Sequence, residues 1–182
     1  MSFEGRAWSA ALVVHGMTET SYKLTPHETV TVKRSDAEVL EVEAEYGPNG
    51  SPPPPHLHPA QAEHFEVLAG ELTARIDGGP ERKLNAGETL DIPAGTKHQM
   101  WNSAGAEARV RWETRPAGRT EDWFRSVDRV VRDAGGKQPG PLAFAPLLNE
   151  YGDVFRLAVG PDAVVRPALR VAGALGRLRG GR

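Results

Sequence analysis

Three histidines and one glutamate stand at a spacing that suits a metal site. His56, His58 and Glu63 fall within eight residues, and His98 follows in a separate stretch. Imidazole nitrogens with one carboxylate are typical ligands of a first-row divalent metal, and iron, manganese, nickel, copper and zinc all suit this set. Such a set leaves one or two coordination positions open for substrate, water or dioxygen. We therefore predict one bound divalent metal, in preference to a vacant interior whose polar side chains only bond one another.

The chain around the first three candidates predicts how they are positioned. Four consecutive prolines, residues 52–55, favour a stiff, extended approach to His56. Residues two apart on a strand share a face, so His56 and His58 are predicted to point the same way. After a bend the next strand returns with Glu63 facing inward and His64 facing outward, as a surface residue.

The second stretch, residues 87–102, is predicted to form a strand at 89–92, a turn at 93–96 and a strand at 98–102. His98 is then the natural fourth ligand and shares its face with Met100. Inward parity also predicts an apolar pocket wall, although ordinary core packing explains the same residues equally well. The predicted wall residues are Phe65, Val67, Met100 and Trp112.

These two stretches resemble the two motifs of the cupin family. Residues 50–70 read Gly, five residues, His-x-His, four residues, Glu, six residues, Gly, and residues 87–102 read Gly, five residues, Pro-x-Gly, two residues, His, three residues, Asn. The resemblance covers roughly residues 28–115. It implies an all-β, antiparallel barrel of the cupin or jelly-roll type, and a structural role for Asn102 at a strand end. Because cupins include dioxygenases, isomerases, decarboxylases, storage proteins and sensing modules, the fold does not select a reaction.

We expect metal-dependent chemistry on a small organic molecule inside the barrel, of an oxygenase or isomerase type. The metal would act as Lewis acid and template, and Glu63 would be a constant ligand or a ligand that also serves as the base. The alternative is a small-molecule-binding or sensing module without turnover. A second inward-facing acid or base would favour the enzyme, but Glu66 has outward parity and Glu71 follows a turn glycine.

The pattern along the chain predicts three segments. Residues 1–24 form an N-terminal segment with a potential edge strand, 25–115 form the barrel, and 116–182 form a helical extension. Within the extension, the helical spacing of apolar residues predicts helices from Thr120, over 142–158 with breaks at Pro146 and Gly152, and from Pro161. We expect the extension to cover the barrel and not to supply the chemistry.

Composition excludes several classes of function. The chain has 182 residues, 39% hydrophobic and 25% charged, with a formal net charge of −2. This charge gives no nucleic-acid footprint, and the absence of cysteine excludes disulfides and thiolate metal sites. The apolar run at 10–14 is too short to span a membrane, so we expect a cytoplasmic protein with no membrane partner.

Two features bear on partners. Unpaired sheet edges predict a homodimer, because an exposed edge strand is a liability that a second copy can cover. Five arginines and no acid occupy residues 166–182. We interpret this basic stretch as a solvated helix face, in preference to a surface that attracts an anionic partner.

Overall fold

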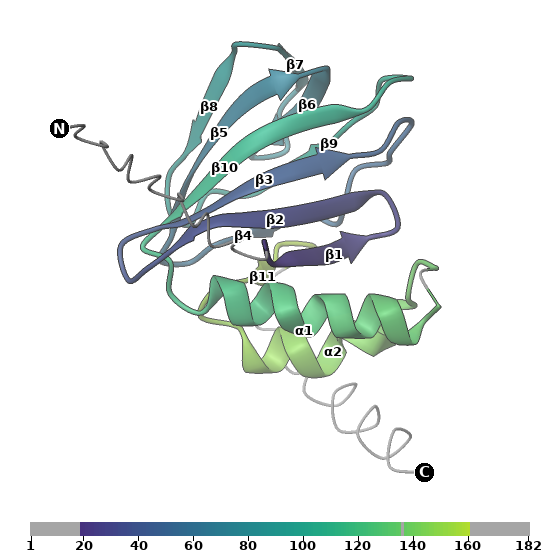
Figure 1. Cartoon of the computed structure of the whole chain (residues 1–182). Helices are drawn as coiled ribbons and strands as arrows, with labels where there is room; N and C mark the ends of the chain where they lie inside the picture. Colours follow the sequence, from purple (N-terminus) through teal and green to yellow (C-terminus); the bar gives the residue numbers. More distant parts are fainter. Residues whose placement is uncertain (1–18, 136, 161–182) are drawn as a thin grey trace, which may run out of the picture.

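The computed structural model describes residues 19–135 and 137–160, which form two facing antiparallel sheets with two helices across one end (Figure 1). The larger sheet has the order β1 (Ser21–Thr25), β2 (Glu28–Ser35), β3 (Leu40–Tyr46), β10 (Ala108–Arg115), β5 (Ala62–Ala69) and β8 (Thr89–Ile92). The smaller sheet has the order β11 (Arg156–Leu157), β4 (His56–Leu57), β9 (His98–Trp101), β6 (Glu71–Ile76) and β7 (Glu81–Asn85). The predicted all-β, antiparallel jelly-roll architecture is confirmed, and its two sheets stay open and are not joined to each other.

The core lies between the sheets, and in the long strands β3, β5 and β10 buried side chains alternate with more exposed ones. In β3, Leu40, Val42, Ala44 and Tyr46 are buried, while the intervening glutamates are more exposed. Strand β10 sits between β3 and β5 and places Trp112 directly opposite Val42 on one side and Phe65 on the other. Apolar residues that recur with a period of two predict one buried face per strand, and these strands of the larger sheet show one.

Two residues tie the ends of strands together. The Asn102 amide nitrogen donates to the carbonyl oxygens of Tyr46, Gly47 and Ala106, which confirms the predicted structural role of Asn102. Gly70 has a φ of 77°, and a Cβ there would collide with the Glu107 carbonyl oxygen. Only glycine therefore fits the turn between β5 and β6.

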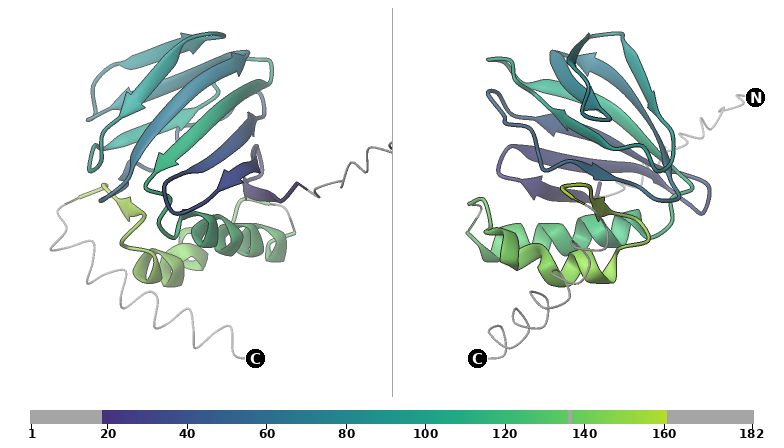
Figure 2. Two further views of the ribbon diagram at one scale, coloured as in Figure 1. Left: turned by 60° about the vertical axis from the view of Figure 1, so that its left-hand side comes forward. Right: turned by 180° about the vertical axis from the view of Figure 1, so that it is seen from behind.

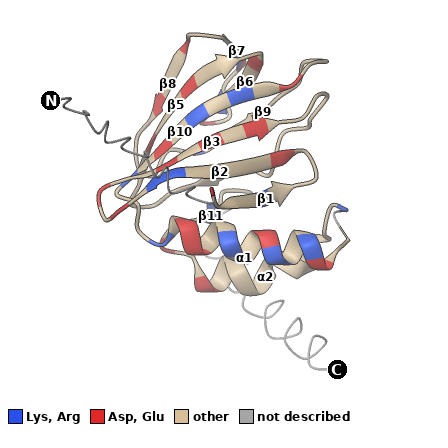
Figure 3. Cartoon of the chain, viewed as in Figure 1, with Lys and Arg blue, Asp and Glu red and all other residues tan. Residues whose placement is uncertain are grey.

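Helix α1 (Thr120–Asp133) packs its apolar stripe on the sheets and turns its charged side outward (Figure 3). Trp123, Phe124, Val127 and Val131 are buried. The helix begins at Thr120, as predicted, and no side chain caps this end. No helix in the described ranges has the length and apolar character needed to cross a membrane.

The predicted second helix is shorter than expected. Helix α2 (Pro141–Glu150) continues through Pro146 and ends at Glu150, so the prediction of helix to residue 158 was wrong. The chain turns at Tyr151 and comes back to the smaller sheet, where β11 pairs with β4 (Figure 2). This pairing outweighs the helical tendency of residues 151–158. The predicted helix from Pro161 and the basic stretch at 166–182 lie outside the described residues.

Candidate metal centre

The structure brings His56, His58 and His98 together on the smaller sheet. His56 of β4 pairs directly with His98 of β9, and His58 follows two residues after His56. The ring centroids of His56 and His98 are 4.4 Å apart, and His58 lies 5.5 and 5.4 Å from them. One ring nitrogen from each histidine lies within 4.8 Å of the others, a separation at which the three nitrogens can hold one ion.

Backbone carbonyls set the orientation of all three rings. The Nδ1 atom of His56 is 3.0 Å from the Pro54 oxygen, that of His98 is 3.0 Å from the Thr96 oxygen, and that of His58 is 2.6 Å from the Val154 oxygen. A carbonyl oxygen only accepts, so each Nδ1 carries the hydrogen. In the neutral ring each Nε2 then has a free lone pair, as a metal ligand requires.

Glu63 reaches this cluster from the opposite sheet. It lies on β5 and is 3% exposed. Its Oε1 accepts a hydrogen bond from Trp112 Nε1 at 3.1 Å and lies 3.3 Å from His58 Nε2. Its Oε2 lies 3.1 Å from His98 Nε2 but without the alignment of a hydrogen bond, and it has no other partner.

The arrangement therefore places hydrogen-bond acceptors of the histidines next to a hydrogen-bond acceptor of Glu63. Free lone pairs on the histidine nitrogens face a buried carboxylate oxygen that lacks a donor, which is costly unless a cation lies between them. A divalent metal satisfies all of these groups at once, and nitrogen and carboxylate are the donor types it takes. The residues present thus fit a metal, with His56, His58 and His98 as its holders and Glu63 beside two of them.

The electrostatics agree with this geometry. Burial first, and then the neighbouring imidazoles of His98 and His58, lower the pKa of His56 to about 3. Burial alone would raise the pKa of Glu63, but His58, His98 and His56 outweigh it and hold that pKa below its usual value. Burial would lower the pKa of His98, yet the Glu63 carboxylate beside it raises it overall.

The four predicted wall residues are all buried near the centre. Phe65 stacks on Trp112 at 5.5 Å between ring centroids, while Val67 and Met100 lie in the same core cluster. Trp112 donates a hydrogen bond from its indole nitrogen to the candidate ligand Glu63. A pocket wall at these positions stays a prediction.

Sequence reasoning missed the part played by residues 151–158. Val154 supplies the oxygen that bonds His58, and the Phe155 ring stacks on His56 at 4.7 Å and 20°. Phe155 also stacks on Trp123 of α1, again at 4.7 Å. A backbone carbonyl leaves no trace in the sequence, and the one available signal was Gly152, which could have ended the helix before Val154.

A second pair of acid groups lies on the inner face of the larger sheet. Glu28 and Tyr46 are cross-strand partners, in line with the buried pair Val30 and Ala44. Although Glu28 keeps some exposure as a residue, desolvation of its carboxyl raises its pKa to about 7 despite a hydrogen bond with Tyr46. Burial, Glu28 and, more weakly, the Glu63 charge raise the pKa of Tyr46 well above its usual value. Sequence reasoning identified neither residue.

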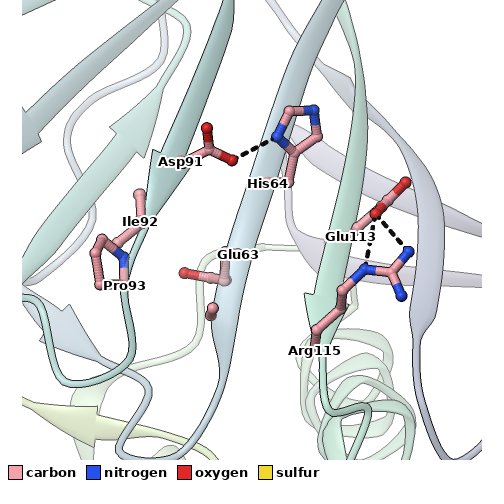
Figure 4. A pocket seen from close by; sticks show the side chains of 8 residues that line it. Glu63, His64, Asp91, Ile92, Pro93, Glu113 and Arg115 are labelled. Carbon is pink, nitrogen blue, oxygen red and sulfur yellow. Dashed lines mark hydrogen bonds and ion pairs between the residues drawn. The ribbon is translucent and has the colours of Figure 1, made fainter.

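A pocket of about 600 Å³ is lined by residues of β5, β8 and β10, and Figure 4 shows its lining. His64 faces outward there, as predicted, and its Nδ1 lies 2.7 Å from Asp91. Arg115 pairs with Glu113 at 2.9 Å. The lining includes Glu63, whose side chain points away from His64, and none of the predicted wall residues.

Comparison with known proteins gives a consistent family. A sequence profile described as the cupin domain matches residues 42–112. A protein named probable oxidoreductase yanE, of Aspergillus niger, is 39% identical over 138 residues, with 61% of this chain and 53% of the relative covered. Probable oxidoreductase virH of Hypocrea virens is 36% identical over 117 residues with the same coverage. The chain spans about half the length of these curated relatives.

Among solved structures, an RmlC-like cupin from Shewanella frigidimarina matches with a TM-score of 0.51 and 16% identity. The match covers 58% of this chain and 91% of that one. At this identity the likeness concerns the fold alone.

Proposed function

The chain belongs to the cupin family, and we propose that it is a metal-dependent oxidoreductase acting on a small organic molecule held between its sheets. The observation that carries the proposal is the cluster of three histidine ring nitrogens beside Glu63, whose Oε2 lies 3.1 Å from His98 Nε2 and has no hydrogen-bond partner. The oxidoreductase class is supported by the names of the relatives that share 36–39% of aligned residues with this chain.

Each residue of the centre has a distinct part in this proposal. His56, His58 and His98 would hold the metal, which when bound supplies Lewis acidity and a template for substrate oxygen atoms. Trp112 holds Oε1 of Glu63 in place and leaves Oε2 free for the metal or for a proton. Because the Glu63 carboxylate stays ionised at neutral pH, it can accept a proton from a bound substrate.

A second acid group favours an enzyme over a binding module. Glu28, with a pKa raised to about 7, can give or take a proton near neutral pH, as a general acid or base requires. The charge of Glu63 contributes to the raised pKa of its partner Tyr46. Glu28 and Glu63 therefore both face the space between the sheets. Glu28 and Tyr46 would therefore supply the second proton-transfer group that the sequence did not reveal.

Elemental analysis of purified protein tests the metal centre. We expect about one divalent metal per chain, and His58→Ala should lose most of it while the far-ultraviolet circular dichroism stays unchanged. His64→Ala is the matched control, because His64 lies six residues away, faces outward and bonds Asp91 instead of the centre. Equal metal content in wild type and His58→Ala would refute the site.

Turnover is tested separately from binding. Metal-loaded protein would be incubated in air with catechol and with 2-hydroxyketones, whose adjacent oxygen atoms suit two open coordination positions, and products would be followed by mass spectrometry. Product formed by wild type and not by Glu63→Gln supports the oxidoreductase. A perturbed spectrum of cobalt-loaded protein with no product from any compound favours the binding module.

A further inference from the structure

The segment Tyr151–Ala158, which we call the strap, runs directly over the histidine cluster. Its backbone pairs with the chain on both sides of His56, because β11 bonds β4 and the Ala158 nitrogen donates to the Pro55 oxygen at 2.8 Å. The strap comes from the helical extension, about 100 positions away in the sequence. The extension that we expected to cover the barrel therefore also touches the histidine cluster.

We propose that the strap is a working part of the metal centre: the Val154 carbonyl and the Phe155 ring position His58 and His56 and thereby set the metal affinity. The inference rests on the proposed metal site. Val154 is 2% exposed, so its carbonyl bonds His58 away from competing water. Outer partners of this kind fix the tautomer and orientation of a ligating imidazole.

The Phe155 ring acts on the other histidine. It lies nearly parallel to the His56 ring at 4.7 Å and edge-on to His58 at 5.8 Å. On its far side it stacks on Trp123, a buried residue of α1. The rings of Trp123, Phe155 and His56 thus form a stack that connects α1 to a candidate ligand. This stack limits rotation of the His56 ring.

The Val154 carbonyl can be tested with a pair of backbone esters in the full-length protein. An ester at position 155 weakens the Val154 oxygen as an acceptor and removes the Phe155 N–H that donates to the Tyr151 oxygen at 2.9 Å. An ester at position 154 is the matched control, because the Val154 N–H donates to the same Tyr151 oxygen at 2.9 Å. The control leaves the Val154 carbonyl intact, so the pair isolates the bond to His58.

Zn²⁺ is the probe, and its dissociation constant is measured by competition with a chromogenic chelator. Loss of an outer partner costs a metal site about 10–100-fold in affinity, so we expect about a tenfold loss for the ester at 155 and no change for the control. The ring ¹⁵N shifts of His58 in metal-free protein should also move away from the pure Nδ1–H form only with the ester at 155. Equal affinities and equal shifts for the two esters overturn the role of the carbonyl.

Phe155 is tested against a phenylalanine of the same extension. Phe155→Ala should weaken Zn²⁺ binding, whereas Phe144→Ala should lower stability alone, because Phe144 is partly buried against the core without a ring contact to the cluster. Equal Zn²⁺ affinity in these two variants overturns the role of the ring. His58→Ala separates the two failures: if it too binds Zn²⁺ as wild type does, the metal site itself is wrong.

Discussion

The indole nitrogen of Trp112 donates a hydrogen bond to Oε1 of Glu63 over 3.1 Å, from β10 to the adjacent β5. Inward parity predicted Trp112 as part of an apolar wall, but its polar edge is what contacts the centre. The bond holds one carboxylate oxygen and leaves the other facing His98. Trp112 is therefore an outer partner of a candidate ligand as well as a core residue.

Trp112→Phe should weaken metal binding by about tenfold, because Glu63 loses the donor that orients it. The phenyl ring preserves most of the packing with Phe65, so the fold should persist. Trp101→Phe is the control, since Trp101 is a buried tryptophan of β9 without a contact to Glu63. Competition titrations with Zn²⁺ measure both, and equal losses would contradict a specific role for the indole.

Metal affinity should rise with pH. Glu63 raises the pKa of His98, so a proton on His98 competes with the metal up to a higher pH than it would at an ordinary histidine. Where that proton is bound, affinity should increase by about tenfold per pH unit, and it should level off above the His98 pKa. Zn²⁺ titrations from about pH 5 to pH 8 measure this. A flat profile would contradict histidine ligation.

Glu28 should make wild-type stability fall as pH rises. Its pKa is about 7 in the folded protein and 4.5 without the fold, so below about 4.5 both states are protonated and its contribution is complete. As pH rises to about 7 the unfolded chain loses this proton first, and the contribution is lost. Glu28→Gln keeps a neutral side chain throughout.

The difference in free energy of unfolding between wild type and Glu28→Gln should therefore shift against the wild type between pH 4.5 and about pH 7. Urea denaturation at a series of pH values measures it. A constant difference across that range would show that the carboxyl titrates normally.

Phe124→Ala should cost about 3–5 kcal/mol, because Phe124 is 2% exposed and packs on Trp112 at 5.1 Å between ring centroids. Leu142→Ala is the control in the same extension, with a side chain that is 58% exposed. Denaturant unfolding measures both variants. A loss below about 1 kcal/mol for Phe124→Ala would mean that the extension does not stabilise the sheets.

We propose that the protein is a dimer. Strands β8 and β7 lie at the edges of the two sheets in the described part of the chain, and an unpaired edge attracts a second strand. Light scattering should give about twice the monomer mass of 19.7 kDa. A value that stays at the monomer mass at high concentration would reject this.

The local sequence pattern was enough to predict the strands and to select the four candidate ligands. Alternation of period two follows from the pleat of a strand, so Leu40 to Tyr46 could be assigned to one buried face without knowledge of the partner strands. His56 and His58 share a face for the same reason, and the motif spacing placed Glu63 and His98 beside them.

The tertiary structure alone decided what surrounds those ligands. The hydrogen bond from His58 to Val154 joins residues 96 positions apart and uses a backbone oxygen. Because every residue carries such an oxygen, the side-chain sequence could not predict this bond. The pairing of Glu28 with Tyr46 depends on the register of β2 against β3, which the pattern of either strand leaves open. Residues 151–158 have helical spacing, but a short helical segment gains little stability without tertiary packing. Pairing of β11 with β4 is favoured instead, and it places the strap beside the candidate metal centre.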